Sequence, residues 1–311
     1  MPSRVDAEAL RSVDPTRPVT TLSGETMGTL WSVRYVSPPS LGEADAVAII
    51  HATLDRIIVE MSQWRTDSII SDFNRAPQGS EVRLPRDFRT VLETALDVAQ
   101  RSDGAFDPTL GRLVDLAGFG PAPATAKVAT DSMDALRAAC WRRLPYAGGR
   151  IVQPGGLALD FSGVAKGHAV DAVADDLAAA GVAHMLVEIG GELVGRGVRP
   201  DGQPWWVDLE APPGKPVPSL RIALHGIAVA TSGHYRRGFH TLDPRTGMPI
   251  GHGPRSVSVI HDKAAYADAW ATALIVLGAD AGMRLAEREG LAVRIVSDDE
   301  ALSPALREML E

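Results

Sequence analysis

The sequence predicts an α+β fold with mainly antiparallel sheets flanked by helices, because short strand candidates occur in runs and helical stretches are grouped between them. Between residues 184 and 230, short apolar segments follow one another and are separated by Gly, Pro and Asp. That pattern favours antiparallel strands joined by turns. A doubly wound parallel sheet would instead alternate strand and helix along the whole chain.

The elements before this run are placed by apolar periodicity and by capping residues. We expect a first strand at Glu25–Val36 and then a helix from about Leu41 to Trp64. Pro85 opens a second helix, which ends before Gly104. Asp107 is expected to cap a further helix, with Pro108 at its first position.

The remaining elements follow from the same rules. Helices are predicted at Asp131–Arg143, at about 163–180, at Tyr266–Leu277 and at Ala281–Glu289. Strands are predicted at Gly156–Phe161, His184–Ile189, Glu192–Val198, Trp205–Glu210, Leu220–Leu224, Ile227–Ala230, Ser256–Ile260 and Leu291–Val296.

Composition indicates a globular protein and argues against nucleic acid as a partner. The chain has 311 residues, 45% of them hydrophobic and 23% charged, which is enough for one large core or two lobes. Its net charge of -8 repels a polyphosphate backbone, and no long Lys/Arg run offers an exception. The single cysteine, Cys140, excludes an intrachain disulfide and is expected to be a small core residue.

The first twenty residues differ in character from the rest. Residues 1–20 are polar and contain proline, so we expect a flexible leader ahead of a single domain at 21–311. This leader has neither the apolar stretch of a signal peptide nor a lipobox-like cysteine, which predicts a cytoplasmic protein; a periplasmic one would imply a truncated chain. No stretch reaches the roughly 18 apolar residues of a transmembrane segment.

The common sequence motifs of nucleotide-binding and zinc-binding sites are missing. The segment Gly163-Val-Ala-Lys166-Gly167 lacks the spacing and the following hydroxyl of a Walker A loop. A G-x-G-x-x-G fingerprint, an H-E-x-x-H pair and paired C-x-x-C sequences are also absent. Any nucleotide must therefore be bound by another architecture.

Three segments nevertheless carry candidate chemistry. Asp268 and Thr272 lie four residues apart in an apolar helix, which puts a carboxylate and a hydroxyl on one face, as Mg²⁺ would require. Between Asp160 and Gly167, a predicted strand gives way to a helix start with Lys166, a setting that favours an anion. His240 precedes a tight D-P-R-T-G turn. Taken singly, each also fits an ordinary structural role.

Together, and in this order, these segments resemble the ApbE family of FAD:protein FMN transferases. The resemblance runs from about Met27 to Gly278 and rests on the following segments: Met27-Gly-Thr29, Met61-Ser-Gln-Trp64, Asp67-Ser68, Asn74-Arg75, Asp103-Gly-Ala105-Phe106-Asp107-Pro-Thr109, Leu116-Ala-Gly-Phe-Gly120, Asp160 to Asp171, Gly190-Gly191, Ala230-Thr-Ser232-Gly233, His240 to Gly247, and Ala267-Asp268 to Thr272.

The resemblance implies a Mg²⁺-dependent enzyme with two lobes and FAD between them. Such an enzyme cleaves FAD and attaches FMN by a phosphoester bond to a Thr or Ser hydroxyl of an acceptor flavoprotein, releasing AMP. Residues expected to hold FAD are Met27, Trp64, Ala105, Phe106, Asp107, Asp160, Lys166 and Leu242, with Trp64 beside the isoalloxazine ring. Mg²⁺ is expected at Asp268, Thr272 and the carbonyl of Gly163, and His240 is expected to act as the general base.

The chain departs from the family pattern at a few positions. They are Ala117 for a usual Trp, Glu188 and Glu192 for the Asn and Asp of N-L-G-G-D, Ser162 for Gly, His168 for Tyr and His234 for Asp. None is a proposed metal ligand, so we expect them to affect acceptor choice or flavin orientation. Two alternatives stay open: a Mg²⁺-dependent FAD diphosphatase that uses water, and a non-catalytic FAD-binding protein.

Overall fold

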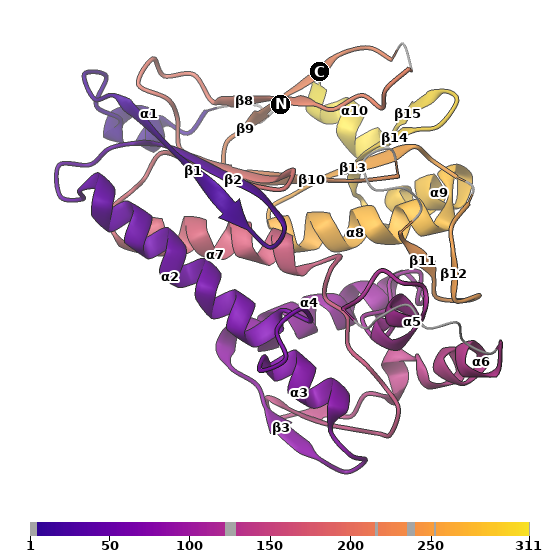
Figure 1. The fold of residues 1–311 in the computed structure, drawn as a ribbon. Coiled ribbons are helices and arrows are strands. Elements are labelled where there is room, and N and C mark those ends of the chain that lie inside the picture. Colours follow the sequence, from indigo (N-terminus) through magenta and orange to yellow (C-terminus); the bar gives the residue numbers. More distant parts are fainter. Residues whose placement is uncertain (1–4, 122–128, 215–216, 235–239, 252, 311) are drawn as a thin grey trace.

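The computed structural model describes residues 5–121, 129–214, 217–234, 240–251 and 253–310, and its centre is a large antiparallel sheet (Figure 1). The sheet has eight strands. Their spatial order is β1 (Val19–Thr26), β2 (Thr29–Val36), β6 (Met185–Ile189), β7 (Glu192–Arg196), β10 (Ile227–Gly233), β13 (Ser256–His261), β14 (Ala292–Val296) and β15 (Glu300–Leu302). Every neighbouring pair is antiparallel, so the predicted fold class is confirmed.

Smaller sheets and the helices surround this centre. The small sheets consist of β3 (Glu81–Arg83), β5 (Arg150–Val152) and β4 (Tyr146–Ala147), of β8 (Trp205–Leu209) with β9 (Leu220–Leu224), and of β11 (Leu242–Asp243) with β12 (Met248–Pro249). The helices are α1 (Ala7–Ser12), α2 (Glu43–Met61), α3 (Ile69–Arg75), α4 (Arg86–Arg101), α5 (Gly111–Leu116), α6 (Ala129–Ala138), the short 3₁₀ turn Trp141–Arg143, α7 (Ala165–Ala179), α8 (Ala264–Leu277), α9 (Ala279–Glu289) and α10 (Pro304–Leu310).

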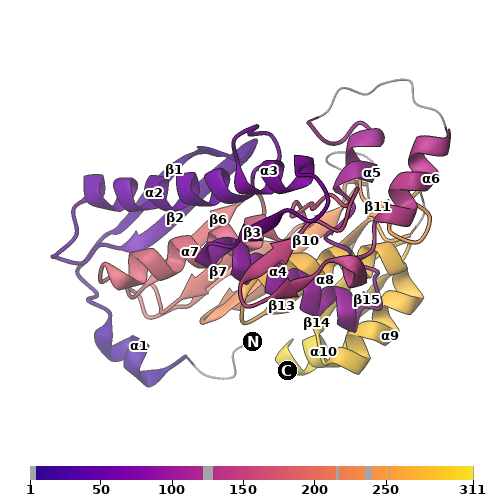
Figure 2. The same cartoon turned by 90° about the horizontal axis from the view of Figure 1, so that it is seen from below.

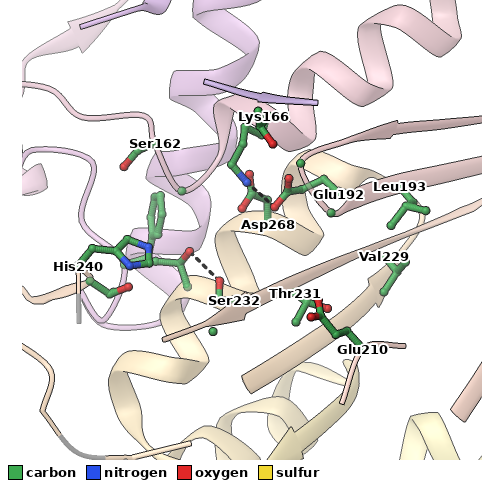
Figure 3. A pocket seen from close by; sticks show the side chains of 18 of the residues that line it. Ser162, Lys166, Glu192, Leu193, Glu210, Val229, Thr231, Ser232, His240 and Asp268 are labelled. Carbon is green, nitrogen blue, oxygen red and sulfur yellow. Dashed lines mark hydrogen bonds and ion pairs between the residues drawn. The ribbon is translucent and has the colours of Figure 1, made fainter. Parts of the chain in front are cut away.

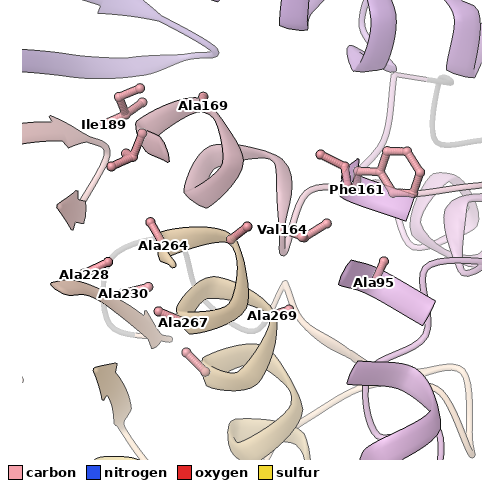
Figure 4. Packing of buried hydrophobic residues seen from close by; sticks show 14 of the residues in the cluster. Ala95, Phe161, Val164, Ala169, Ile189, Ala228, Ala230, Ala264, Ala267 and Ala269 are labelled. Atoms are coloured by element: carbon pink, nitrogen blue, oxygen red, sulfur yellow. The ribbon is translucent and has the colours of Figure 1, made fainter. Parts of the chain in front are cut away.

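Helices α7 and α8 cover one face of the sheet, and α2 and α4 form a second layer outside them (Figures 1 and 2). Buried alanines on both sides allow α8 to approach β10 closely; Ala230, Ala264 and Ala267 meet there (Figure 4). Because α8 is apolar almost all round, it is a buried core helix, and the main hydrophobic core surrounds it. Burying a carboxylate on such a helix is unfavourable unless a hydrogen bond or a positive charge compensates for the lost water.

The opposite face of the sheet is covered by the β8–β9 hairpin and by α10. Trp205 and Val207 of the hairpin pack with Val229 of the sheet and Leu306 of α10 in a second core. Both faces are therefore covered over the middle of the sheet, whereas β1 and β2 leave Thr21, Ser23 and Arg34 exposed. In the part of the chain that the structure describes, no helix is long and apolar enough to span a bilayer.

Two strand predictions need correction. The predicted strand Glu25–Val36 spans two strands of a hairpin, because the chain reverses at Met27 and Gly28, where φ is 49° and 70°. The predicted strand Gly156–Phe161 forms only a single bridge, between Leu110 and Ala158. The amide N–H and the carbonyl of Leu159 bond the Asn74 side chain instead of a neighbouring strand, 2.7 and 2.9 Å away.

Two other local predictions also differ from the structure. Asp107 does not begin a helix: α5 starts at Gly111 with Leu110 as its cap. Cys140 lies beyond the end of α6 and is only half-buried, so it is not a core residue. Within the predicted leader, α1 lies against the domain, where the N–H of Asp6 donates to Nε2 of His225 at 3.1 Å.

Candidate functional site

A cavity of about 800 Å³ lies between the β6–β7 turn, strand β10 and helices α7 and α8. It brings together most of the predicted site residues, from segments far apart in the sequence (Figure 3). Those lining it are Ala105, Phe106, Asp107, Asp160, Gly163, Lys166, His240, Leu242, Asp268 and Thr272. Figure 3 shows Lys166 and Asp268 on one side of the cavity and His240 on another.

The other two predicted FAD-binding residues do not line this cavity. Met27 is half-buried in the β1–β2 turn and packs against the main core, and Thr29 of that turn reaches the cavity. Trp64 follows α2, and 72% of its surface is exposed. Its proposed position beside the flavin ring stays a prediction.

The α8 face predicted for metal binding points into the cavity. Asp268 is buried, and its Oδ2 accepts a hydrogen bond from the N–H of Gly167 at 3.1 Å. Thr272 lies one turn along, with its Oγ1 3.3 Å from Oγ of Ser232. Burial raises the pKa of Asp268, and the positive charge of Lys166 opposes that rise. The carboxylate therefore needs a cation beside it, either the Lys166 ammonium or a bound metal ion, to stay ionised.

Two glycines bring the start of α7 against α8. A Cβ on Gly163 would lie 3.0 Å from Oγ1 of Thr272, so the Gly163 backbone directly borders the face predicted for metal binding. A Cβ on Gly167 would lie 2.2 Å from the carbonyl oxygen of Ala264. The Asp171 carboxylate then caps α8, accepting from the N–H groups of Ala264 and Ala265 at 3.1 Å each. The packing of α7 against α8 thus fixes the position of Lys166 relative to Asp268.

This close approach makes Gly167→Ala a destabilising change. We expect it to lower the free energy of unfolding by about 1–3 kcal/mol, because a backbone carbonyl cannot move aside without separating the helices. The matched control is Gly251→Ala, since a Cβ there meets nothing within 4 Å. Chemical denaturation of both variants measures the difference, and equal stabilities would contradict the packing described.

Lys166 pairs with Glu192, which the sequence analysis named only as a departure from the family pattern. The positive-φ turn Gly190-Gly191 ends the β6–β7 hairpin and places Glu192 at the first position of β7, with its side chain 3% exposed. Burial raises the pKa of Glu192 to about 7; Lys166 opposes this rise and Asp268 adds to it. The available signal was a charged residue directly before the apolar pair Leu193-Val194.

Asp107 and Asp160 organise the loops around the cavity. Oδ1 of Asp107 accepts from the N–H of Thr109 at 2.9 Å and from its hydroxyl at 2.6 Å, and Oδ2 accepts from the N–H of Trp141 at 3.2 Å. Burial raises the Asp107 pKa against these hydrogen bonds. Asp160 accepts from the N–H of Ser162 at 2.7 Å. Both carboxylates therefore fix backbone amides beside the predicted phosphate-binding segment.

His240 lies at the cavity on the segment that leads into β11. The turn after it is held by Asp243, whose carboxylate binds Arg245 at 2.8 and 2.7 Å. The ring of His234 lies 6.3 Å from that of His240, edge to face. A rigid turn thus presents an imidazole to the cavity, as a general base requires.

The departures from the family pattern fall in different places. Ser162, Glu188 and Glu192 line the cavity, and His234 lies beside His240. His168 is buried, with Nε2 3.2 Å from Oδ1 of Asp87. Ala117 is exposed. Ser162, Glu188, Glu192 and His234 are therefore the departures placed to influence a ligand.

Comparison with known proteins agrees with this arrangement. The ApbE family model matches residues 27–295. The chain belongs to the ApbE family. A FAD:protein FMN transferase of Vibrio cholerae is 35% identical over 288 residues, covering 88% of this chain and 86% of that protein. One from Escherichia coli is 32% identical over 297 residues, covering 90% and 85%.

Solved ApbE structures share the whole architecture. The apo form of the Pseudomonas stutzeri flavinyl transferase ApbE superposes with a TM-score of 0.87 at 37% identity, covering 94% of this chain and 96% of that one. The Thermotoga maritima ApbE protein gives 0.82 at 27% identity, covering 94% and 99%. The predicted family is therefore confirmed.

Proposed function

We propose that this chain is a Mg²⁺-dependent FAD:protein FMN transferase, which moves the FMN half of FAD onto a Thr or Ser hydroxyl of an acceptor protein and releases AMP. The observation that carries the proposal is that Lys166, His240 and Asp268, from three separate elements, meet in one cavity. Relatives that match most of the chain are FAD:protein FMN transferases.

The cavity residues fit Mg²⁺ by their chemistry. Asp268 and Thr272 present a carboxylate and a hydroxyl, and the backbone of Gly163 borders Thr272. Among the described residues, no group of three or more His, Cys, Asp or Glu side chains could hold a metal. A site with one carboxylate and one hydroxyl suits Mg²⁺, which usually keeps several water ligands and binds phosphate oxygens of the substrate. When bound, Mg²⁺ would offset negative charge on the FAD diphosphate.

The protein's own groups supply the remaining steps. Lys166 adds a positive charge beside the diphosphate, and the start of α7, which follows the loop that Asp160 holds through the Ser162 N–H, favours the same anion. The oxygen of the acceptor hydroxyl attacks the phosphorus of the FMN half, and His240 accepts the proton of that hydroxyl. The bond to the AMP phosphate breaks, and AMP leaves with the electron pair.

Incubation of the full chain with FAD, Mg²⁺ and a peptide that carries Thr beside Ala tests the proposal. We expect AMP and FMN-peptide in equal amounts, measured by chromatography and by peptide mass. A peptide with Val in place of that Thr is the control and should gain no mass. AMP with free FMN and an unmodified peptide would instead indicate a diphosphatase. FAD bound without any AMP would indicate a binding protein.

A further inference from the structure

Lys166, Glu192 and Asp268 form a buried cluster of one positive and two negative side chains. Figure 3 shows the Lys166 ammonium directed toward both carboxylates. Lys166 forms its ion pair with Oε1 of Glu192, whose Oε2 has no hydrogen-bond partner among the described residues. A buried carboxylate oxygen left in this way is rare and points to a functional role.

Without Glu192, the nearest counter-charge to Lys166 would be Asp268. The two side chains already interact electrostatically, since Lys166 opposes the rise in the Asp268 pKa. A flexible lysine in a cavity of low dielectric would close onto the remaining carboxylate. Asp268 would then be neutralised by an internal ion pair, and a cation would have to displace that ammonium.

We propose that Glu192 is a positioning residue: its carboxylate holds the Lys166 ammonium so that the lysine serves the diphosphate while Asp268 keeps its charge for Mg²⁺. This inference rests on the proposed function. Lys166, Glu192 and Asp268 together carry one net negative charge, and an uncharged side chain in place of Glu192 would leave none. The hairpin turn Gly190-Gly191 gives the carboxylate its fixed place.

Mg²⁺ binding to the full chain without FAD, measured by calorimetry, tests this role independently of turnover. Glu192→Gln should weaken Mg²⁺ binding by roughly tenfold or more, because Lys166 then pairs with Asp268. Adding Lys166→Met should restore binding to near the wild-type value, although transfer stays impaired. Asp208→Asn removes a charge at the exposed rim of the same cavity and should leave binding nearly unchanged.

Each outcome has a distinct meaning. Wild-type affinity in Glu192→Gln would overturn the inference. Weak binding that persists in the double variant would do the same, because it would make Glu192 a direct ligand. If Glu192→Gln does not fold, Lys166→Met alone should bind Mg²⁺ at least as tightly as the wild type, and weaker binding overturns the inference. Equal Mg²⁺ binding by the wild type and Asp268→Asn would instead refute the metal site of the proposed function.

Discussion

Replacing Asp268 by Asn should reduce FMN transfer by at least roughly 10²- to 10³-fold, the usual cost of losing a group that stabilises developing charge. Its carboxylate is the only acidic group among the proposed metal ligands, so an amide would hold Mg²⁺ poorly. The fold should not suffer: Asn can still accept the Gly167 N–H, and burial already disfavours the charged form of Asp268. The melting temperature is therefore expected to stay level or rise.

Steady-state AMP release and thermal unfolding of the same preparation check both halves of this expectation. Asp262→Asn is the matched control, because it removes an exposed carboxylate just before α8. Undiminished transfer in Asp268→Asn, or wild-type transfer that survives excess EDTA, would remove the metal from the mechanism.

Replacing His240 by Ala should leave FAD affinity within a few-fold but lower turnover by roughly 10²- to 10⁴-fold, the usual size of a general-base contribution. The reason is geometric: the imidazole lies at the cavity on a different side from Asp268, so its removal leaves the Asp268 side intact. Transfer at saturating FAD and acceptor, together with FAD binding measured by fluorescence, separates the two effects.

His51→Ala is the control for histidine removal, since His51 is exposed on α2. We expect it to turn over normally. A His240 variant that binds FAD weakly yet turns over normally at saturation would reassign His240 to binding, and Lys166 with the metal would then account for most of the rate.

Sequence patterns predicted those parts of the site in which the residues that meet are close together in the chain. Asp268 and Thr272 share a face because they are one turn apart, and an apolar helix around them marks the carboxylate as unusual. The role of Glu192 was not predictable, because it depends on how α7 meets β7. The failed strand at Gly156–Phe161 has the same cause: the Asn74 side chain, distant in sequence, satisfies the Leu159 backbone.

The floor of the cavity, at the contact between α7 and α8, should tolerate substitutions less well than its rim. The floor, where Gly167 touches Ala264 and Asp171 caps α8, cannot shift without disturbing the Lys166 and Asp268 positions together. The rim, formed by the β8–β9 hairpin, belongs to a separate core. A changed rim segment should thus alter the entrance to the cavity while Lys166 and Asp268 keep their positions on the floor.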